Sequence, residues 1–204
     1  SHNIKSLASD GDFLWVGART GLSRYDKITG QWKNMQIQGN PSIRSIGVDG
    51  RYLWLGTMRG VILYDKMIGS VVKFYRDYAP VRDIDVEGKV VWITTPNQIA
   101  LFRRERYGDR WTTLMGAEIR DFVQGEPPRV KRLKEDLGIL DCTNLLRISN
   151  TAWFGRAHGI SLYNIGRQKP IKKVPFPESL KNQKVTDFAF DGRDVWIATR
   201  EGLY

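Results

Sequence analysis

Basic side chains recur at matching points along this sequence of 204 residues, and they are its clearest candidates for chemistry. Lysine and arginine together number 32 against 22 aspartates and glutamates, so the formal net charge is +10. Arginine binds carboxylate and sulfate groups through paired hydrogen bonds, which favours an acidic ligand. The candidate ligand-binding residues are Lys5, Arg19, Arg44, Arg59, Arg82, Arg156, His158 and Arg200.

Side chains suited to catalysis or metal binding are scarce. The one cysteine, Cys142, excludes an intramolecular disulfide and a cysteine-cluster zinc site, and no histidine lies near it in sequence to activate it. The two histidines, His2 and His158, are isolated from other catalytic residue types. Asp83 and Asp187 are the best candidates for an enzymatic carboxylate pair. We therefore predict no catalytic residue, no metal ligand and no cofactor.

An internal repeat must position the basic residues, and five tryptophans mark it. The repeated segments begin at Ile4, Ile43, Val81, Leu145 and Val185. Their tryptophans are Trp15, Trp54, Trp92, Trp153 and Trp196, at spacings of 39, 38, 61 and 43 residues. A period near 40 residues is typical of β-propeller blades.

Each unit is predicted to be a four-stranded antiparallel meander. An alternating strand leads to an Asp-Gly turn, in which we expect both residues to have positive φ. A short apolar strand with the tryptophan at its centre follows, then a glycine turn and two more strands. One such sheet cannot bury its own apolar faces, so the units must stack with their tryptophans in the core.

The sequence therefore predicts an all-β fold, a β-propeller of about five blades in a single domain. The blades are expected at residues 4–38, 43–78, 81–114, 143–178 and 185–204. The last one stops in its third strand, which favours a fragment of a larger propeller. Residues 116–141 are an insertion, in which Pro127-Pro128 and Gly138 predict the start and end of a short helix.

Antiparallel pairing predicts where the candidate basic residues gather. They lie at the starts of first strands or in the turns between second and third strands, which share one end of every blade. We expect this end to form an electropositive rim around the channel mouth. Two alternatives remain: the side chains are simply solvated, or they pair with aspartates of the neighbouring blade. At the opposite end, Asp26 and Asp65 are expected to bind the amides of the following turn.

A second basic cluster spans residues 167–184. Its lysines and prolines are typical of an edge strand that resists aggregation. Nucleic-acid binding is not predicted, because Phe176 is the only aromatic residue placed there for stacking on bases.

The repeated pattern D-G-x-x-L-W-[VIL]-G-T-x-x-G-[LV]-x-x-Y-D resembles the two-component regulator propeller repeat of bacterial sensor proteins. The resemblance covers residues 4–102 and 185–204 well and 143–165 loosely. The fourth unit lacks the Asp-Gly turn, and Thr94-Thr95-Pro96-Asn97 replaces Gly-Thr-x-x-Gly in the third. The resemblance implies a non-enzymatic sensor of signal transduction, placed in the periplasm or outside the cell, with an acidic small molecule or glycan fragment as ligand.

Two other functions stay open from the sequence. One is a protein-docking propeller of a cell-surface or secretion assembly, and the other is a propeller lyase or hydrolase. No apolar run of eighteen residues is present, so no membrane span is predicted in this chain. A homodimer, if formed, is expected to assemble through the full-length protein.

Overall fold

The computed structural model describes residues 3–76, 78, 80–88, 90–96, 98–103, 110–115, 118–123, 129–132, 141–167, 169–171 and 176–204. Within these segments the chain is all-β, with antiparallel sheets and one three-residue 3-10 helix, η1 (Glu178–Leu180). The chain divides into two compact units, residues 1–93 and 94–204. Across the described segments, no helix has the length and apolar character needed to cross a bilayer.

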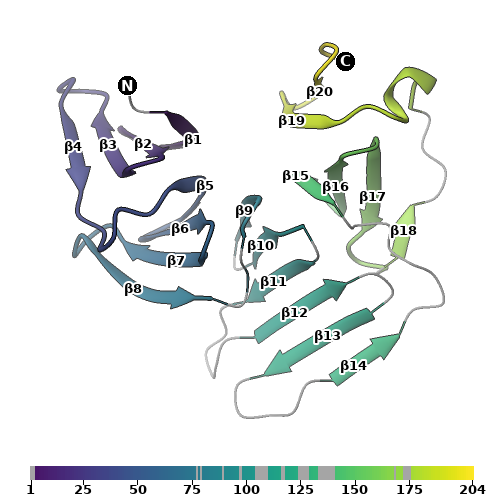
Figure 1. The fold of residues 1–204 in the computed structure, drawn as a ribbon, viewed down its shortest axis with the longest axis horizontal. Helices are drawn as coiled ribbons and strands as arrows, with labels where there is room; N and C mark the ends of the chain where they lie inside the picture. Colours follow the sequence, from purple (N-terminus) through teal and green to yellow (C-terminus); the bar gives the residue numbers. More distant parts are fainter. Residues whose placement is uncertain are drawn as a thin grey trace. The chain divides into compact units, whose positions relative to one another are not determined.

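Two four-stranded meanders open the first unit (Figure 1). In both, the strands pair in sequence order and every pair is antiparallel. The strands of the first sheet are β1 (Ile4–Asp10), β2 (Phe13–Ala18), β3 (Gly21–Asp26) and β4 (Trp32–Met35). Those of the second are β5 (Ile43–Asp49), β6 (Tyr52–Thr57), β7 (Gly60–Asp65) and β8 (Ser70–Tyr75). The neighbouring strands β9 (Asp83–Glu87) and β10 (Val90–Thr94) follow.

The second unit begins with four strands that pair in sequence order. Its strands are β11 (Ile99–Arg103), β12 (Arg110–Met115), β13 (Glu118–Val123) and β14 (Arg129–Arg132). A four-stranded sheet follows, made of β15 (Cys142–Ile148), β16 (Thr151–Arg156), β17 (Ile160–Asn164) and β18 (Lys169–Ile171). The last sheet has two strands, β19 (Val185–Phe190) and β20 (Val195–Thr199).

The helix predicted in the insertion is wrong where the structure describes it. Residues Arg129–Arg132 form β14, which pairs with β13, and residues 133–138 lie outside the described residues. Proline and glycine indicate where an element begins and ends, but they do not determine whether the residues between them form a helix or a strand. Short isolated helices are marginally stable, whereas the free edge of β13 supplies a complete set of backbone partners. The insertion thus extends the sheet beyond β12.

The first turn of each sheet differs in detail from the prediction. Asp10 pairs with Phe13 as the last residue of β1, so Gly11 and Asp12 are the two loop residues. Only the glycine has positive φ, +55° for Gly11 and +50° for Gly50. Glycine at the first loop position is the requirement of a type II′ turn, whereas the prediction assumed type I′. The aspartate is thereby free to bond elsewhere, and its Oδ2 accepts the indole N–H of Trp15 at 3.1 Å.

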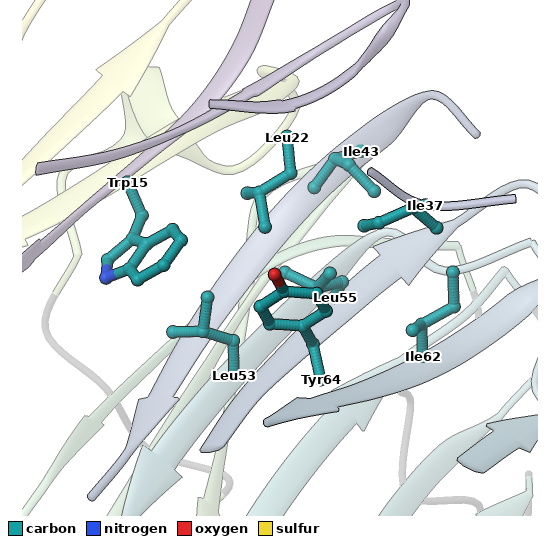
Figure 2. Packing of buried hydrophobic residues seen from close by; sticks show 8 residues of the cluster. All are labelled: Trp15, Leu22, Ile37, Ile43, Leu53, Leu55, Ile62 and Tyr64. Carbon is teal, nitrogen blue, oxygen red and sulfur yellow. The ribbon is translucent and has the colours of Figure 1, made fainter. Parts of the chain in front are cut away.

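The core of the first unit lies between the β1–β4 and β5–β8 sheets. Figure 2 shows Trp15 and Leu22 of the first sheet above Leu53, Leu55 and Tyr64 of the second. Successive residues of a strand face opposite sides, so Leu53 and Leu55 point toward the first sheet and Trp54 points away from it. The apolar faces are therefore buried by stacking of sheets, as the repeat predicts.

A glycine in the second strand of three sheets makes room for the next sheet. A Cβ atom on Gly17 would lie 2.7 Å from Cγ2 of Ile43, the first residue of β5. The same relation joins Gly56 to Val81, at 2.6 Å, and Gly155 to Val185, at 2.7 Å. None of these glycines has positive φ, so they are needed for space and not for backbone conformation. We call each such pair a glycine junction.

The tryptophans are buried only where another sheet covers them. Trp15, Trp54 and Trp92 are 1%, 0% and 1% exposed, which confirms the prediction for the first three units. Trp153 is half-buried against Phe188 of the next sheet. For Trp196 the prediction of a core position is wrong, because its side chain is 44% exposed. Among the described residues, no sheet lies over its face of the β19–β20 pair.

Candidate functional site: the basic end of the sheets

A β-bulge begins the first strand of four sheets and positions one side chain in each. The register shifts fall between Ile4 and Ser6, Ile43 and Ser45, Cys142 and Asn144, and Val185 and Asp187. The extra residues are Lys5, Arg44, Thr143 and Thr186. A bulge turns its side chain away from the regular alternation, and bulges are common beside binding sites.

The turn between second and third strands lies beside each bulge. Ala18 pairs with Gly21, so Arg19 occupies a two-residue turn. Thr57 pairs with Gly60, which places Arg59 in the corresponding turn. Because the strands are antiparallel, bulge and turn share one end of the sheet. We call this the basic end.

Five of the predicted residues lie at the basic end of the sheets in the first unit. Lys5, Arg19, Arg59 and Arg82 are exposed, and Arg44 is half-buried. The backbone N–H of Val81 donates to the carbonyl of Thr57 at 2.9 Å, so Arg82 lies next to the turn that carries Arg59. These positions agree with the predicted end of the blades.

Arg44 is the most constrained of the five. Its Nη1 donates to Sδ of Met58, 3.2 Å away, and its buried Nε has no hydrogen-bond partner among the described residues. A thioether is a weak acceptor, so the guanidinium keeps most of its hydrogen-bonding capacity. Arg44 is therefore suited to bind an anion.

The second unit holds the other three predicted residues. Arg156 ends β16, and its Nη1 donates to Oγ of Ser161 on β17 at 3.1 Å while its buried Nε lacks a partner. His158 is exposed in the following turn, and Arg200 is exposed in the turn after β20. Ser161 and the bulge residue Thr143 were missed by the sequence reasoning. Aligning Thr143 with Lys5 and Arg44 in the repeat would have found its position.

Salt bridges are not found at the predicted basic side chains within the described part of the chain. Within the described residues, none of the eight predicted side chains forms a salt bridge, so the alternative of pairing with neighbouring aspartates is not found there. The prediction that all eight surround one channel mouth stays a prediction.

The candidate enzymatic carboxylates lie in different units. Oδ1 of Asp83 accepts the backbone N–H of Ile84 at 2.8 Å, and Oδ1 of Asp187 accepts that of Phe188 at 2.9 Å. In the part of the chain that the structure describes, no three histidine, cysteine or acidic residues cluster as metal ligands. Cys142 is buried, and its Sγ lies 3.3 Å from the carbonyl oxygen of Asn144.

The end opposite the basic end is built from acidic turn residues. Oδ1 of Asp65 accepts the N–H groups of Met67 and Ile68, and Oδ1 of Asp26 accepts those of Ile28 and Thr29. The predicted role of both aspartates is thus confirmed. The backbone N–H of Thr29 is the main cause that lowers the pKa of Asp26. Burial raises the pKa of Asp65, but bonds from Ile68, Met67 and Arg51 outweigh burial, and the pKa is lowered.

The outer face of the β1–β4 sheet carries a cavity of about 640 Å³, which the sequence did not predict. Its lining includes Val16, Ser23, Trp32 and Asn34. The signal in the sequence is the alternation of β2, which gives the sheet a second apolar face at Leu14 and Val16. Ile4, Ala18 and Thr20 also line the cavity, so it reaches the basic end beside Lys5 and Arg19.

Solved structures that share this fold include two extracellular domains of BT4673 and the N-terminal domain of Nup159. The extracellular domain of the putative hybrid two component system BT4673 from B. thetaiotaomicron aligns with a TM-score of 0.68 and 19% identity, over 98% of this chain and 25% of that one. An extracellular domain described as the putative one component system BT4673 aligns at 0.59 and 16%, over 100% and 31%. The N-terminal domain of Nup159 aligns at 0.60 and 9%, over 98% and 74%.

These likenesses establish the fold. No family model and no curated protein matches the sequence. The chain spans about a quarter to a third of the length of the two BT4673 structures. The resemblance to two-component sensor proteins is confirmed at the level of structure, since extracellular domains of that system share the arrangement of strands.

Proposed function

We propose that this chain is a non-enzymatic sensing module whose sheets are the blades of a β-propeller. The four-stranded meanders would be the blades at residues 4–38, 43–78 and 143–178, with further blades at 81–114 and 185–204. Stacking through glycine junctions supports this arrangement, because each junction seats the first strand of one sheet on the second strand of the sheet before it. The fold of the BT4673 extracellular domains supports the sensing role.

The module is placed in the periplasm or outside the cell. This placement rests on the fold shared with domains that are themselves extracellular. In a two-component system such a domain passes ligand binding to the rest of its chain, so the signal requires a conformational response to binding.

The ligand is an acidic small molecule or glycan fragment that binds the basic end. The observation that carries this is Arg44, whose Nη1 donates to a thioether and whose buried Nε has no hydrogen-bond partner among the described residues. The exposed Arg19 and Arg59 lie in turns at the same end and form no salt bridges with described residues. A carboxylate or sulfate group would give Arg44 charge-assisted hydrogen bonds, which are about twice as strong as neutral ones.

Calorimetric titration with sulfated and uronic-acid oligosaccharides tests this function. We expect Arg44→Gln to weaken binding roughly tenfold, the effect of losing one charge-assisted hydrogen bond. Charge reversal in Arg59→Glu and Arg156→Glu should weaken it further. Arg193→Gln is the control, since Arg193 is exposed at the opposite end of its sheet. Equal affinities for the wild type and both charge reversals would refute the basic end as the binding site.

A further inference from the structure

The edge strand β8 of the second sheet carries a row of exposed apolar side chains. Val71, Val72 and Phe74 are 41%, 50% and 36% exposed. Val71 pairs with Tyr64 of β7 and therefore shares its side of the sheet. Phe74 shares the side of Ile62 in the same way. Both β7 residues belong to the core between the first two sheets (Figure 2), so the exposed row lies at the outer margin of that core.

The edge strands β4, β14 and β18 are built differently. An exposed apolar edge strand readily associates with other chains, and charged residues or proline prevent this. β4 has Lys33 and Asn34 at exposed positions, β18 contains Pro170, and the sequence of β14 is Arg-Val-Lys-Arg. β8 has one charged residue, Lys73. The apolar row of β8 therefore lacks the protection that these three edges have.

Arg24 places a positive charge near this row. It pairs with Trp15, whose ring belongs to the same core, so the arginine faces the second sheet. Its guanidinium lies 4.2 Å from the ring centroid of Phe13. Burial raises the pKa of Tyr64, and the charge of Arg24 opposes this rise. Arg24 therefore lies near the tyrosine that pairs with Val71.

Arg24 and Lys33 form a like-charged pair across β3 and β4. They lie directly opposite each other and share a side of the sheet, where Lys33 is exposed. Like charges at such positions destabilise a sheet. In the second sheet the corresponding pair is Leu63 and Lys73, so the repeat does not require two basic residues here. Neither Arg24 nor Lys33 forms a salt bridge with a described residue, and a carboxylate bound between them would relieve their repulsion.

Positive charge also borders the row on β8 itself. The guanidinium of Arg76 lies 5.2 Å from the ring centroid of Phe74. Nζ of Lys73 lies 4.8 Å from the ring centroid of Tyr75. The whole chain carries a formal net charge of +10. A second copy of this chain would bring like charges together at this surface, whereas an acidic partner would be attracted to it.

We propose that an extended acidic segment of another protein binds along β8, with apolar side chains against Val71, Val72 and Phe74 and a carboxylate between Arg24 and Lys33. Sheet edges are a common binding site for extended segments of other chains. The apolar contacts provide affinity, and the carboxylate fixes the position of the segment along the strand. This surface lies within the first unit and shares no residue with the basic end, so the proposal does not depend on the proposed ligand.

Peptides selected from a random display library on the wild-type chain test this proposal without assuming a sequence. We expect the selected peptides to combine apolar residues with aspartate or glutamate. By fluorescence anisotropy, Arg24→Gln should weaken their binding roughly tenfold, the effect of losing one charge-assisted hydrogen bond. Val72→Ser should weaken it several-fold, because the change removes an apolar contact at the centre of the row.

Matched changes elsewhere serve as controls. Leu7→Ser removes an exposed aliphatic side chain from the other side of the first sheet, and Arg193→Gln removes an exposed charge. Both should bind the peptides as the wild type does. Arg24→Lys keeps the charge without the paired hydrogen bonds and should bind with intermediate affinity. If Arg24→Gln lowers the thermal midpoint, Val72→Ser still tests the surface, because Val72 is half exposed.

Several results would overturn the proposal. Selected peptides without acidic residues would exclude the role of Arg24 and Lys33. Peptides that lose binding in Arg44→Gln but keep it in Arg24→Gln would bind the basic end instead. A failure to select any peptide would exclude an extended segment as the partner. A dimer in sedimentation velocity that Val72→Ser dissociates would identify a second copy of this chain as the partner.

Discussion

Ile43 occupies the space in which Gly17 would carry a side chain. A Cβ atom on the glycine would lie 2.7 Å from Cγ2 and 2.9 Å from Cβ of the isoleucine. The isoleucine branches at Cβ, close to the backbone, so it cannot move aside without shifting β5. Stacking of the first two sheets thus depends on the lack of a side chain at Gly17 as much as on the apolar side chains around it.

We predict that Gly17→Ala destabilises the chain by about 1–3 kcal/mol, the usual cost of overpacking a core. Equilibrium urea denaturation measures the free energy of unfolding. Combining the change with Ile43→Ala should cost less than the sum of the two single variants, because the second change removes the Cγ2 atom that a Cβ at residue 17 would meet. If the losses in the free energy of unfolding are additive, the alanine destabilises β2 itself and not the contact between Gly17 and Ile43.

Acid should weaken the hairpin of the last sheet at an unusually low pH. The backbone N–H of Asp194, the indole of Trp196 and the backbone N–H of Arg193 lower the pKa of Asp191 from 3.8 to about 2. Because the folded pKa is the lower one, the carboxylate stabilises the fold above about pH 4, and this contribution is lost as the pH falls toward 2.

Carbon-detected NMR of the Asp191 carboxyl group measures this titration directly. The midpoint should lie near pH 2, and the Trp196 indole proton should shift with it. Asp191→Asn should remove this step from the pH dependence of stability. A midpoint near 3.8 would contradict the hydrogen-bonded geometry of the turn.

Two equivalent aspartates should differ in their contribution to stability. Asp65 is 2% exposed, and its Oδ2 also accepts Nε of Arg51 at 2.7 Å, whereas Asp26 is more exposed. Removing the acceptor at residue 65 breaks three partly buried hydrogen bonds, which is costly. Asp65→Ala should therefore lower the thermal midpoint clearly more than Asp26→Ala. Similar shifts of the thermal midpoint for both variants would show that the burial of Asp65 and its contact with Arg51 do not add to stability.

The sequence predicts local features well because their causes are local. Spacing of the tryptophans, alternation in strands and the acidic turn residues Asp26 and Asp65 all act over a few residues. The positions of Lys5, Arg44 and Arg59 at one end follow from antiparallel order alone. The β-bulge that turns Arg44 has no signal in a single strand, since it reflects a register shift against the partner strand.

Features that depend on a neighbouring sheet are beyond such reasoning. Trp196 lies in the same repeated pattern as Trp54, yet it is exposed because no described sheet covers it. Likewise, Arg129–Arg132 forms a strand because its backbone pairs with the edge of β13. The local sequence of these residues does not indicate that this edge is present. Burial and pairing at these positions are properties of the assembled sheets.

Backbone amide shifts during titration with a sulfated oligosaccharide decide whether the basic end of the sheets binds an acidic ligand. The opposite end of the same sheets is an internal control. We expect shifts at Lys5, Arg19, Arg44 and Arg59, with none at Gly11 or Gly69. Shifts confined to the Gly11 and Gly69 turns, or no shifts with any acidic oligosaccharide, would contradict it.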